Sequence, residues 1–438
     1  MTSSDPASPP GLSARKAAVA ILSDVLRRKR PLDAAADDAL TQAKLAPRDA
    51  GFARAIATTS LRRFGQLEAL ILNFVEKTPP PHKAGPALEI LIAGACELMF
   101  LSVAPHAAVD AANRLAQADP KAVHFKGLIN AVLRRVAREG MSVIARQDPE
   151  RLNTTDWLWQ RWVENHGEEG ARAIAHAHSE IPPLDLTLKS YDDPYTELMD
   201  ALALAPGRVR LRHAGRVEDL PGFSEGRWWV QDFAASLPAG LSGPLAGERV
   251  IDLCAAPGGK TAQLAAAGGN VTAVDLSGER LGRVAENLER LHLSAELIAA
   301  DARDWRPQTP APFVLLDAPC TATGTIRRHP DLPWLKTAAD LDIAERLQSE
   351  LLDAAADMTA PGGMLVYAVC SLEPEEGIEQ IAQFLRKRSD FRRLPISEGE
   401  LFDARFATPE GDLKTLPSYW PERGGMDGFY AARLVRSV

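Results

Sequence analysis

The fold is decided by Val250-Ile251-Asp252-Leu253-Cys254-Ala255-Ala256-Pro257-Gly258-Gly259-Lys260-Thr261. Its first four residues form a mostly apolar run that predicts a short buried strand. The small residues that follow predict a tight turn into a helix, and the unpaired backbone N–H groups at such a helix start can hold a nucleotide. We therefore expect a cofactor site at this turn.

Two phosphate-binding motifs are similar to this turn, but neither matches it. Gly259-Lys260-Thr261 looks like the end of a P-loop, whose first glycine would have to stand where Cys254 is. The G-x-G-x-x-G spacing of dinucleotide-binding turns is also absent. For the loop considered alone, an ordinary turn without a ligand stays open as the alternative.

Each later apolar run is followed by an acid or a thiol. The runs are residues 270–274 before Asp275, 295–299 before Asp301, 313–316 before Asp317, and 364–368 before Val369-Cys370-Ser371. In an open parallel sheet, ligands bind beyond the carboxyl ends of the strands, so we expect these groups to converge on one crevice. An acid at the end of the second strand is placed to accept hydrogen bonds from a ribose diol.

From about Phe233 onward, strand patterns alternate with helix patterns. Helices are expected over residues 278–291, 338–358 and 375–387, and Pro361-Gly362-Gly363 predicts a tight turn that feeds a strand starting at Met364. This alternation predicts an α/β fold with a doubly wound parallel sheet. Residues 429–435 are the candidate for a last strand.

Length and composition are those of a globular protein with two or three domains. The chain has 438 residues, of which 46% are hydrophobic and 25% charged. The most apolar helical stretch, residues 88–104, carries Glu89 and Glu97, so we expect no membrane span. Residues 1–11 are rich in Ser and Pro and predict a disordered tail, not a signal peptide. A cytoplasmic location is the expectation that follows.

The cysteines and the charges limit the classes of partner. The four cysteines form no C-x-x-C pair and no dense disulfide pattern, so we expect reduced thiols and no metal site. The net charge is −8, yet residues 1–145 carry 19 Lys and Arg against 13 Asp and Glu. The basic end is therefore the expected phosphate contact.

The first half of the chain divides into a helical part and a mixed part. Apolar residues recur at helical spacing through residues 13–140, with basic clusters at 27–30, 62–63 and 134–138 that either contact RNA or are solvated surface. Residues 145–235 predict a small α+β module, with a helix over 156–177 and strands over 184–189 and 208–212. Trp228 and Trp229 are expected either to pack in a core or to stack on bases.

Three blocks of the chain together resemble the Sun-type RNA (cytosine-5) methyltransferases. They are the stretch from Asp252 to Thr261, Asp317-Ala318-Pro319-Cys320-Thr321-Ala322-Thr323-Gly324, and Tyr367-Ala368-Val369-Cys370-Ser371. The resemblance implies a class I, Rossmann-like domain that uses S-adenosyl-L-methionine. It implies cofactor contacts from the residues of the turn and from the strand-end acids, namely Cys254, Ala255, Ala256, Pro257, Gly258, Gly259, Lys260, Asp275, Asp301 and Asp317.

Residues 107–112 and 127–134 are similar to a NusB-like helical RNA-binding domain. Such a domain ahead of a Sun-type domain is typical of the bacterial RsmB-type rRNA methyltransferases. The expected domains are a tail (1–12), a NusB-like domain (13–143), an α+β module (144–235) and a methyltransferase domain (236–438). The resemblance implies methylation of 16S rRNA by a protein that binds no DNA and no membrane, and we expect a monomer.

The chemistry of a pyrimidine explains why two cysteines matter. Carbon 5 is too weakly nucleophilic to take a methyl group unaided, and a thiolate that adds to carbon 6 activates it. Cys320 and Cys370 both qualify, and their spacing does not decide which one attacks. The RNA family that the chain resembles implies Cys370 as nucleophile and Cys320 as the residue that removes the carbon 5 proton or releases the adduct.

The remaining candidates surround these cysteines. Asp317 is expected to hydrogen-bond the ring of the target cytosine, with a strand cap as its alternative. Lys260 is expected to reach a carboxylate or a phosphate, or to form a salt bridge. Arg327 and Arg328 are expected to grip phosphates, whereas His329 is expected to be a structural residue of its loop.

Two other functions stay open from the residues alone. One is the same chemistry on tRNA or 23S rRNA, because accessory domains and RNA shape set the choice of substrate. The other is a non-catalytic RNA-binding or antitermination factor that has kept the methyltransferase fold. The presence of both cysteines and of Asp317 favours an enzyme.

Overall fold

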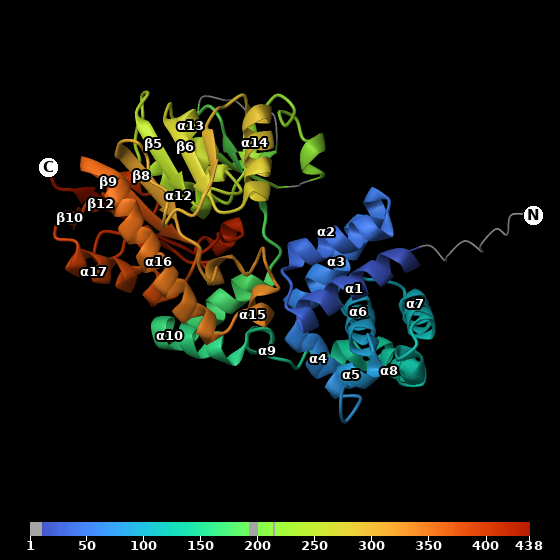
Figure 1. The fold of residues 1–438 in the computed structure, drawn as a ribbon. Coiled ribbons are helices and arrows are strands. Elements are labelled where there is room, and N and C mark those ends of the chain that lie inside the picture. Colours follow the sequence, from blue (N-terminus) through green and yellow to red (C-terminus); the bar gives the residue numbers. More distant parts are fainter. Residues whose placement is uncertain (1–10, 192–199, 213–214) are drawn as a thin grey trace, which may run out of the picture. The chain divides into compact units, whose positions relative to one another are not determined.

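The computed structural model describes residues 11–191, 200–212 and 215–438, so the predicted tail lies almost wholly outside the described residues. The chain divides into two compact units. We call residues 11–180 together with Ile326–Thr337 the helical unit. Residues Ile181–Thr325 and Ala338–Val438, within the described ranges, form the sheet unit. Figure 1 shows the blue to green helices of the first and the yellow to red strands of the second.

The helical unit confirms the helical prediction for residues 13–140. Its helices are α1 (Leu12–Arg28), α2 (Leu32–Ala43), α3 (Pro47–Arg62), α4 (Phe64–Leu72), α5 (Pro81–Ala84), α6 (Ala87–Met99), α7 (Pro105–Ala118), α8 (Lys126–Ile144), α9 (Pro149–Leu152), α10 (Asp156–Ser179) and α15 (Leu332–Leu335). Proline starts α3, α5, α7 and α9, because its fixed φ suits a first turn whose N–H needs no partner.

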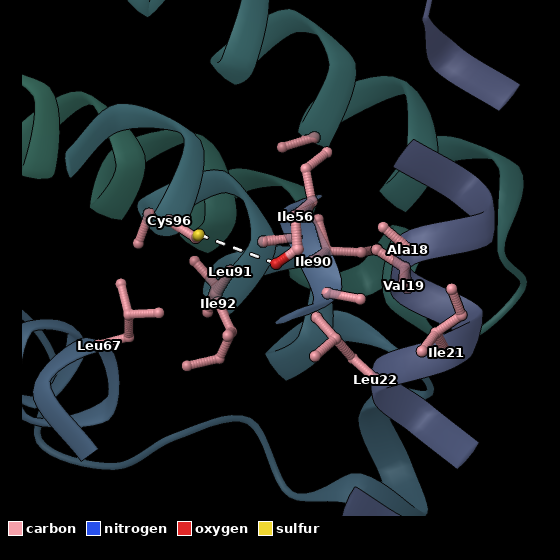
Figure 2. Packing of buried hydrophobic residues seen from close by; sticks show 14 of the residues in the cluster. Ala18, Val19, Ile21, Leu22, Ile56, Leu67, Ile90, Leu91, Ile92 and Cys96 are labelled. Carbon is pink, nitrogen blue, oxygen red and sulfur yellow. Dashed lines mark hydrogen bonds between the residues drawn. The ribbon is translucent and has the colours of Figure 1, made fainter. Parts of the chain in front are cut away.

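The apolar stripes of α1 to α8 form one core together with α15, and Figure 2 shows part of it around α1, α3 and α6. The thiol of Cys96 points to the carbonyl oxygen of Ile56, 3.9 Å away. The two glutamates of the apolar helix α6 are buried beside arginines, and Glu97 lies 2.6 Å from Arg15. Burying these carboxylates is feasible because each one is paired. No helix in the described part of the chain is long and apolar enough to cross a membrane.

A segment from far along the sequence completes the helical unit. Residues Ile326–Thr337, which follow the predicted cysteine loop, group with the N-terminal helices. The carboxylate of Asp331 accepts a hydrogen bond from the backbone N–H of Leu32 at 2.8 Å and so caps α2. The indole N–H of Trp334 donates to the carbonyl of Leu61 at 2.9 Å. Sequence spacing had predicted only a loop here.

The sheet unit begins with a small antiparallel sheet in the order β2-β3-β1-β4. Its strands are β1 (Leu184–Leu188), β2 (Ala201–Ala205), β3 (Arg208–Leu211) and β4 (Trp228–Val230). The strands predicted over 184–189 and 208–212 are confirmed, whereas β2 and β4 were not predicted. Trp228 and Trp229 are buried, so they pack in cores and do not offer their faces to RNA bases.

The main sheet has the order β10-β12-β9-β8-β5-β6-β7, with β11 paired to β12. Its strands are β5 (Arg249–Leu253), β6 (Asn270–Asp275), β7 (Glu296–Ala299), β8 (Ala311–Asp317), β9 (Thr359–Val369), β10 (Phe391–Arg393), β11 (Leu413–Thr415) and β12 (Phe429–Arg436). Strands β5 to β9 are parallel, as the sequence predicted, and β12, the candidate last strand, pairs antiparallel with β9. The α/β fold class is confirmed.

Helices cover both faces of this sheet. Successive side chains of a strand point to opposite faces, so alternate residues contact the helices on one face or the other. The helices are α12 (Phe233–Gly240), α13 (Gly259–Ala266), α14 (Gly278–Leu291), α16 (Ala338–Met358) and α17 (Ile378–Lys387). Val314 and Leu316 of β8 pack with α16 and α17, whereas Phe313 and Leu315 pack with α12 and α13. The next residue on the second face is Asp317, which therefore points to the α13 side.

One predicted boundary is wrong. The turn expected at Pro361-Gly362-Gly363 lies inside β9, which starts at Thr359. The pairing of β8 with β9 shifts register between Ala311 and Phe313, and Gly362 has a φ of 75°. The glycines therefore form an irregularity within the strand, where a positive φ costs glycine little.

Candidate active site

The strand order of the sheet unit reverses between β5 and β8. From β5 the chain runs outward through β6 and β7, and β8 then pairs with the other side of β5. Leu253, the last residue of β5, lies opposite Leu316, which precedes the last residue of β8. Open parallel sheets bind ligands beyond the carboxyl ends of the strands at such a reversal. The predicted cofactor turn after β5 lies at this point.

The turn after β5 has a backbone that only certain residues allow. Cys254 has a φ of 60° and Gly258 a φ of 97°. A Cβ on Gly258 would lie 2.9 Å from Cγ1 of Val284, so glycine is needed for space as well as for conformation. Helix α13 begins directly after Gly258, and its first N–H groups have no partner within the helix. The strand–turn–helix over residues 250–261 is confirmed, and its contacts with the cofactor stay a prediction.

Asp275 ends β6 and ties this turn to the sheet. Its Oδ2 accepts a hydrogen bond from the backbone N–H of Ala256 at 3.0 Å, and its Oδ1 accepts one from Ser277 at 2.9 Å. The guanidinium of Arg280 lies 3.5 Å from the same carboxylate. The predicted contact with ribose hydroxyls would use the remaining lone pairs of a carboxylate that already holds the turn.

Asp301 lies just beyond β7, on the flank of the crevice. Its carboxylate accepts a hydrogen bond from Nη2 of Arg303 at 2.7 Å and is partly exposed. The hydrogen bonds from the side chain and backbone of Arg303 lower the pKa of Asp301. The carboxylate is thus kept as an acceptor, which is the form that Asp301 needs for its predicted cofactor contact, for example with an amine of the adenine ring.

Lys260 of α13 and Asp317 of β8 form an ion pair, with Nζ 2.7 Å from Oδ2. The ammonium is buried, 5.0 Å from the centre of the Phe429 ring. Burial lowers the pKa of Lys260, but the charge of Asp317, the hydrogen bond to it and the charge of Cys370 together raise that pKa further. Lys260 is therefore charged, and its interpretation as a salt-bridge residue is confirmed.

Cys320 and Cys370 meet with their sulfurs 3.4 Å apart. They lie in the loops that follow β8 and β9, which are neighbours in the sheet. The hydrogen bond to Cys370, burial and the charges of Cys370 and Glu376 raise the pKa of Cys320 well above its usual range. Either sulfur can be the donor of this hydrogen bond. The structure brings the two candidate cysteines together, and the separate role of each one stays a prediction.

Hydroxyl groups join the two cysteine loops. Oγ of Ser371 lies 3.2 Å from Oγ1 of Thr321 and 3.2 Å from Oγ1 of Thr323. The backbone N–H of Gly324 donates to the carbonyl of Cys370 at 3.0 Å. Because these bonds connect both loops, they fix the separation of the two sulfurs.

Comparison with known proteins identifies the family. Residues 241–435 match the family model described as 16S rRNA methyltransferase RsmB/F, and residues 12–138 match that of the NusB family. A protein of Pseudomonas putida named Ribosomal RNA small subunit methyltransferase B is 37% identical over 452 residues, which is 98% of this chain and 98% of that protein. The chain belongs to the RsmB/F methyltransferase family.

Solved structures share the fold of this RsmB/F chain. The crystal structure of PH0851 aligns with a TM-score of 0.75 at 22% identity, over 98% of this chain and 99% of that one. NSun6 from Pyrococcus horikoshii, solved with SFG, aligns with a TM-score of 0.56 at 19% identity, over 65% of this chain and 98% of that one. The family confirms the prediction of an S-adenosylmethionine-dependent rRNA methyltransferase with a NusB-like part.

The carboxyl ends of the strands carry groups that suit an adenosyl group. Asp275 and Asp301 offer acceptors for hydroxyl and amine groups, and the backbone at Gly258 allows close approach. Leu276, directly after Asp275, exposes 76% of its surface. We expect the adenine ring to pack on this side chain, because a large exposed apolar group beside polar acceptors is typical of ligand sites.

The predicted phosphate grip of Arg327 is wrong. Its side chain is only 2% exposed, so its guanidinium cannot reach the backbone of a bound RNA. The carbonyl of Arg327 accepts a hydrogen bond from Arg62 at 2.6 Å inside the helical unit. Arg328 is half-buried and His329 is exposed, with Nδ1 4.0 Å from a carboxylate oxygen of Asp33. His329 is a loop residue of the helical unit, as predicted.

Acidic partners neutralise part of the basic clusters in the NusB-like helices. Arg28 and Arg30 each lie 2.7 Å from a carboxylate oxygen of Asp24, and Arg138 lies 2.6 Å from Glu139. Such exposed pairs contribute little stability and can exchange an acid for a phosphate. Contact of these clusters with RNA stays a prediction.

Asp252 is a buried acid beneath the cofactor turn. Its Oδ2 accepts a hydrogen bond from the hydroxyl of Thr261 at 2.6 Å, and among the described residues no group donates to Oδ1. Burial raises the pKa of Asp252 from 3.8 to about 7. The charges of Asp317 and Asp275 also raise this pKa, whereas the hydrogen bond from Thr261 lowers it. The folded protein therefore holds a proton here that the unfolded chain releases in weak acid.

Stability is expected to fall between pH 4 and pH 7 because of this proton. Below pH 4 both states hold it, and between pH 4 and 7 only the folded state does, so each rise in pH favours unfolding. The variant Asp252→Asn lacks this titrating group. The unfolding free energy of the variant minus that of wild type should therefore be roughly 2–3 kcal/mol larger at pH 8 than at pH 5. Urea titrations of both proteins at the two pH values measure this difference.

The exposed Asp342→Asn variant is the matched control and should follow wild type at both pH values. An Asp252→Asn curve parallel to wild type would show that Asp252 is ionised in the folded protein.

Proposed function

We propose that the chain methylates carbon 5 of a cytosine in 16S rRNA through a covalent bond between Cys370 and carbon 6. The observation that supports it most is the pair of sulfurs 3.4 Å apart, beside the Lys260–Asp317 ion pair. A lone cysteine at a strand end would suit many functions. Two cysteines in donor–acceptor contact suit a reaction in which one sulfur adds to a base and later leaves it.

The residues of the chain divide the reaction between them. The thiolate of Cys370, which the ammonium of Lys260 attracts, adds to carbon 6 and places an electron pair on carbon 5. Asp317 hydrogen-bonds the pyrimidine ring and orients it for this attack. When bound, S-adenosylmethionine supplies an electrophilic methyl group, which carbon 5 takes up.

Cys320 completes the reaction. Its sulfur accepts the proton that carbon 5 loses while its own proton passes to the departing sulfur of Cys370. The carbon 6–sulfur bond breaks, the ring double bond returns, and both cysteines end as thiols. The contact between the two sulfurs at 3.4 Å offers a direct path for this proton.

Methyl transfer to purified RNA tests the proposal. The protein, supplied with radiolabelled S-adenosylmethionine and 16S rRNA from a strain that lacks the corresponding gene, should produce 5-methylcytosine at one position by nucleoside mass spectrometry and bisulfite sequencing. Label confined to tRNA or 23S rRNA would overturn the substrate, and a different methylated nucleoside would overturn the chemistry. No transfer to any RNA would favour a non-catalytic RNA-binding factor.

We also propose a domain organisation, an oligomeric state and a cellular location for the protein. We infer a NusB-like RNA-binding domain (13–143), an α+β module (144–235) and a catalytic domain (236–438), acting as a monomer on RNA and not on DNA. Residues 144–180 of the module and Ile326–Thr337 of the catalytic domain group with the helical unit. The cytoplasm is the expected location, because rRNA is processed there in bacteria such as Pseudomonas putida, the source of the relative. Light scattering of the protein with and without RNA tests the monomer.

A further inference from the structure

The backbone on both sides of Cys320 is held by two buried side chains. On one side, Nε2 of Gln348 donates to the carbonyl of Pro319 at 2.9 Å. On the other side, the backbone N–H of Thr321 donates to Oε1 of Glu376 at 2.8 Å. Gln348 also donates to this Oε1 at 2.9 Å, so the two side chains are joined. Cys320 therefore lies between two residues whose backbones are fixed.

The carboxylate of Glu376 is fully buried and makes further contacts. Its Oε2 accepts a hydrogen bond from the hydroxyl of Thr321. The backbone carbonyl of Glu376 accepts one from the hydroxyl of Tyr367, in β9, at 2.7 Å. A buried carboxylate is costly unless donors surround it, and here the donors come from α16 and from the loop that carries Cys320. The arrangement orders that loop.

The same short segment carries Cys370. Glu376 lies in a 3₁₀ turn over Pro374–Glu376, six residues after Cys370. Between them, Oγ of Ser371 accepts a hydrogen bond from the backbone N–H of Glu373 at 3.1 Å. Both sulfurs are thus held by one connected set of hydrogen bonds that ends at Glu376.

We propose that Glu376 is a positioning residue that holds the thiol of Cys320 against the sulfur of Cys370, and that this contact sets the rate of adduct release. The inference rests on the proposed function, because release requires Cys370 to form an adduct. Glu376 acts through Cys320 and touches no reacting atom. Its negative charge is also one of the causes, after the Cys370 hydrogen bond and burial, that raise the pKa of Cys320.

Three variants test the proposal. Glu376→Met keeps the length of the side chain and removes its acceptors, Glu376→Gln keeps one acceptor and the shape, and Gln348→Met removes the donor to Pro319. The matched control is Glu379→Met, three residues later on α17, where the side chain is exposed. Each variant is measured for kcat, for the KM of RNA and of S-adenosylmethionine, and for covalent protein–RNA adduct on denaturing gels.

Glu376→Met is expected to lower kcat about 100-fold with both KM values unchanged, because a displacement of about 1 Å at a reacting group has this effect. Adduct should accumulate, Glu376→Gln should restore most of the rate, and Gln348→Met should share the defect. Glu379→Met should behave as wild type. A kcat of Glu376→Met equal to that of the control, or a loss without accumulated adduct, would overturn the proposal.

A second measurement needs no RNA and keeps the two proposals apart. Diamide treatment of the protein should form the Cys320–Cys370 disulfide quickly, and mass spectrometry of the linked peptides gives its rate. Glu376→Met and Gln348→Met should slow it about tenfold, because a disulfide demands specific geometry. If Glu376→Met does not fold, Glu376→Gln and Gln348→Met carry the test. Unchanged cross-linking rejects Glu376 as a positioning residue, whereas absence of 5-methylcytosine with wild type rejects the proposed function.

Discussion

Cys370→Ala is expected to abolish both methyl transfer and the covalent adduct, whereas Cys320→Ala is expected to trap the RNA on the protein. Without the sulfur of Cys370, carbon 5 is never activated, so transfer should fall by about 10⁴-fold or more. Without Cys320, attack and methylation still occur, but no sulfur next to Cys370 accepts the carbon 5 proton, so the carbon 6–sulfur bond does not break and the adduct persists. The measurement is a denaturing gel of protein with labelled RNA, beside a methyl-transfer assay.

The matched control is Cys96→Ala, which makes the same substitution in the core of the helical unit. Burial raises the pKa of Cys96 to about 12, so this thiol is inert at neutral pH. The variant should lose some stability and keep both activity and adduct turnover. If Cys320→Ala instead loses the adduct and Cys370→Ala accumulates it, the two roles are reversed and Cys320 is the nucleophile.

The cofactor side of the crevice was predictable from local patterns. An apolar run followed by an acid predicts a strand of the parallel sheet with the acid at its carboxyl end. Asp275, Asp301 and Asp317 all lie at or just beyond such strand ends. The turn at residues 254–258 was predictable for the same reason, since small residues between a strand and a helix allow few conformations. These features depend on residues close together in the sequence.

The predictions that were wrong concern features that depend on contacts between residues far apart in the sequence. Nothing in the neighbourhood of Arg327 shows that residues Ile326–Thr337 belong to the core of the helical unit, about 300 residues earlier in the chain. Two adjacent arginines after a cysteine block look like a phosphate site until one of them is found buried. Local charge patterns cannot distinguish the two cases.

Glu376 was missed for a similar reason. It stands among acidic residues in a short turn, and its neighbour Glu375 has the same local signal. Only the approach of Gln348 and Thr321 distinguishes Glu376, and these partners lie 28 and 55 residues away. The pairing of Lys260 with Asp317 is likewise set by the alternation of β8, which needs the strand boundary to be known.

The ion pair gives the second large effect. Asp317→Asn is expected to lower kcat by about 10²–10³-fold, because a preorganised acid that shares a proton with ring nitrogen 3 helps the ring accept electron density during attack, and Asn cannot share that proton. Lys260→Met should cost much less, because the ammonium acts on the ring only through Asp317 and on Cys370 only through its charge. Single-turnover methyl transfer at saturating S-adenosylmethionine measures both effects, and calorimetric titration shows whether the cofactor still binds.

The double variant separates a direct role of Asp317 from a purely structural one. If Asp317 serves only as the partner of Lys260, Asp317→Asn, Lys260→Met and the double variant should lose the same activity, because each breaks the same pair. If Asp317 contacts the cytosine, Asp317→Asn should be far worse than Lys260→Met, and the double variant should resemble Asp317→Asn. Asp301→Asn provides the contrast at another strand end, where the expected effect is a higher KM for the cofactor and only a small change in kcat.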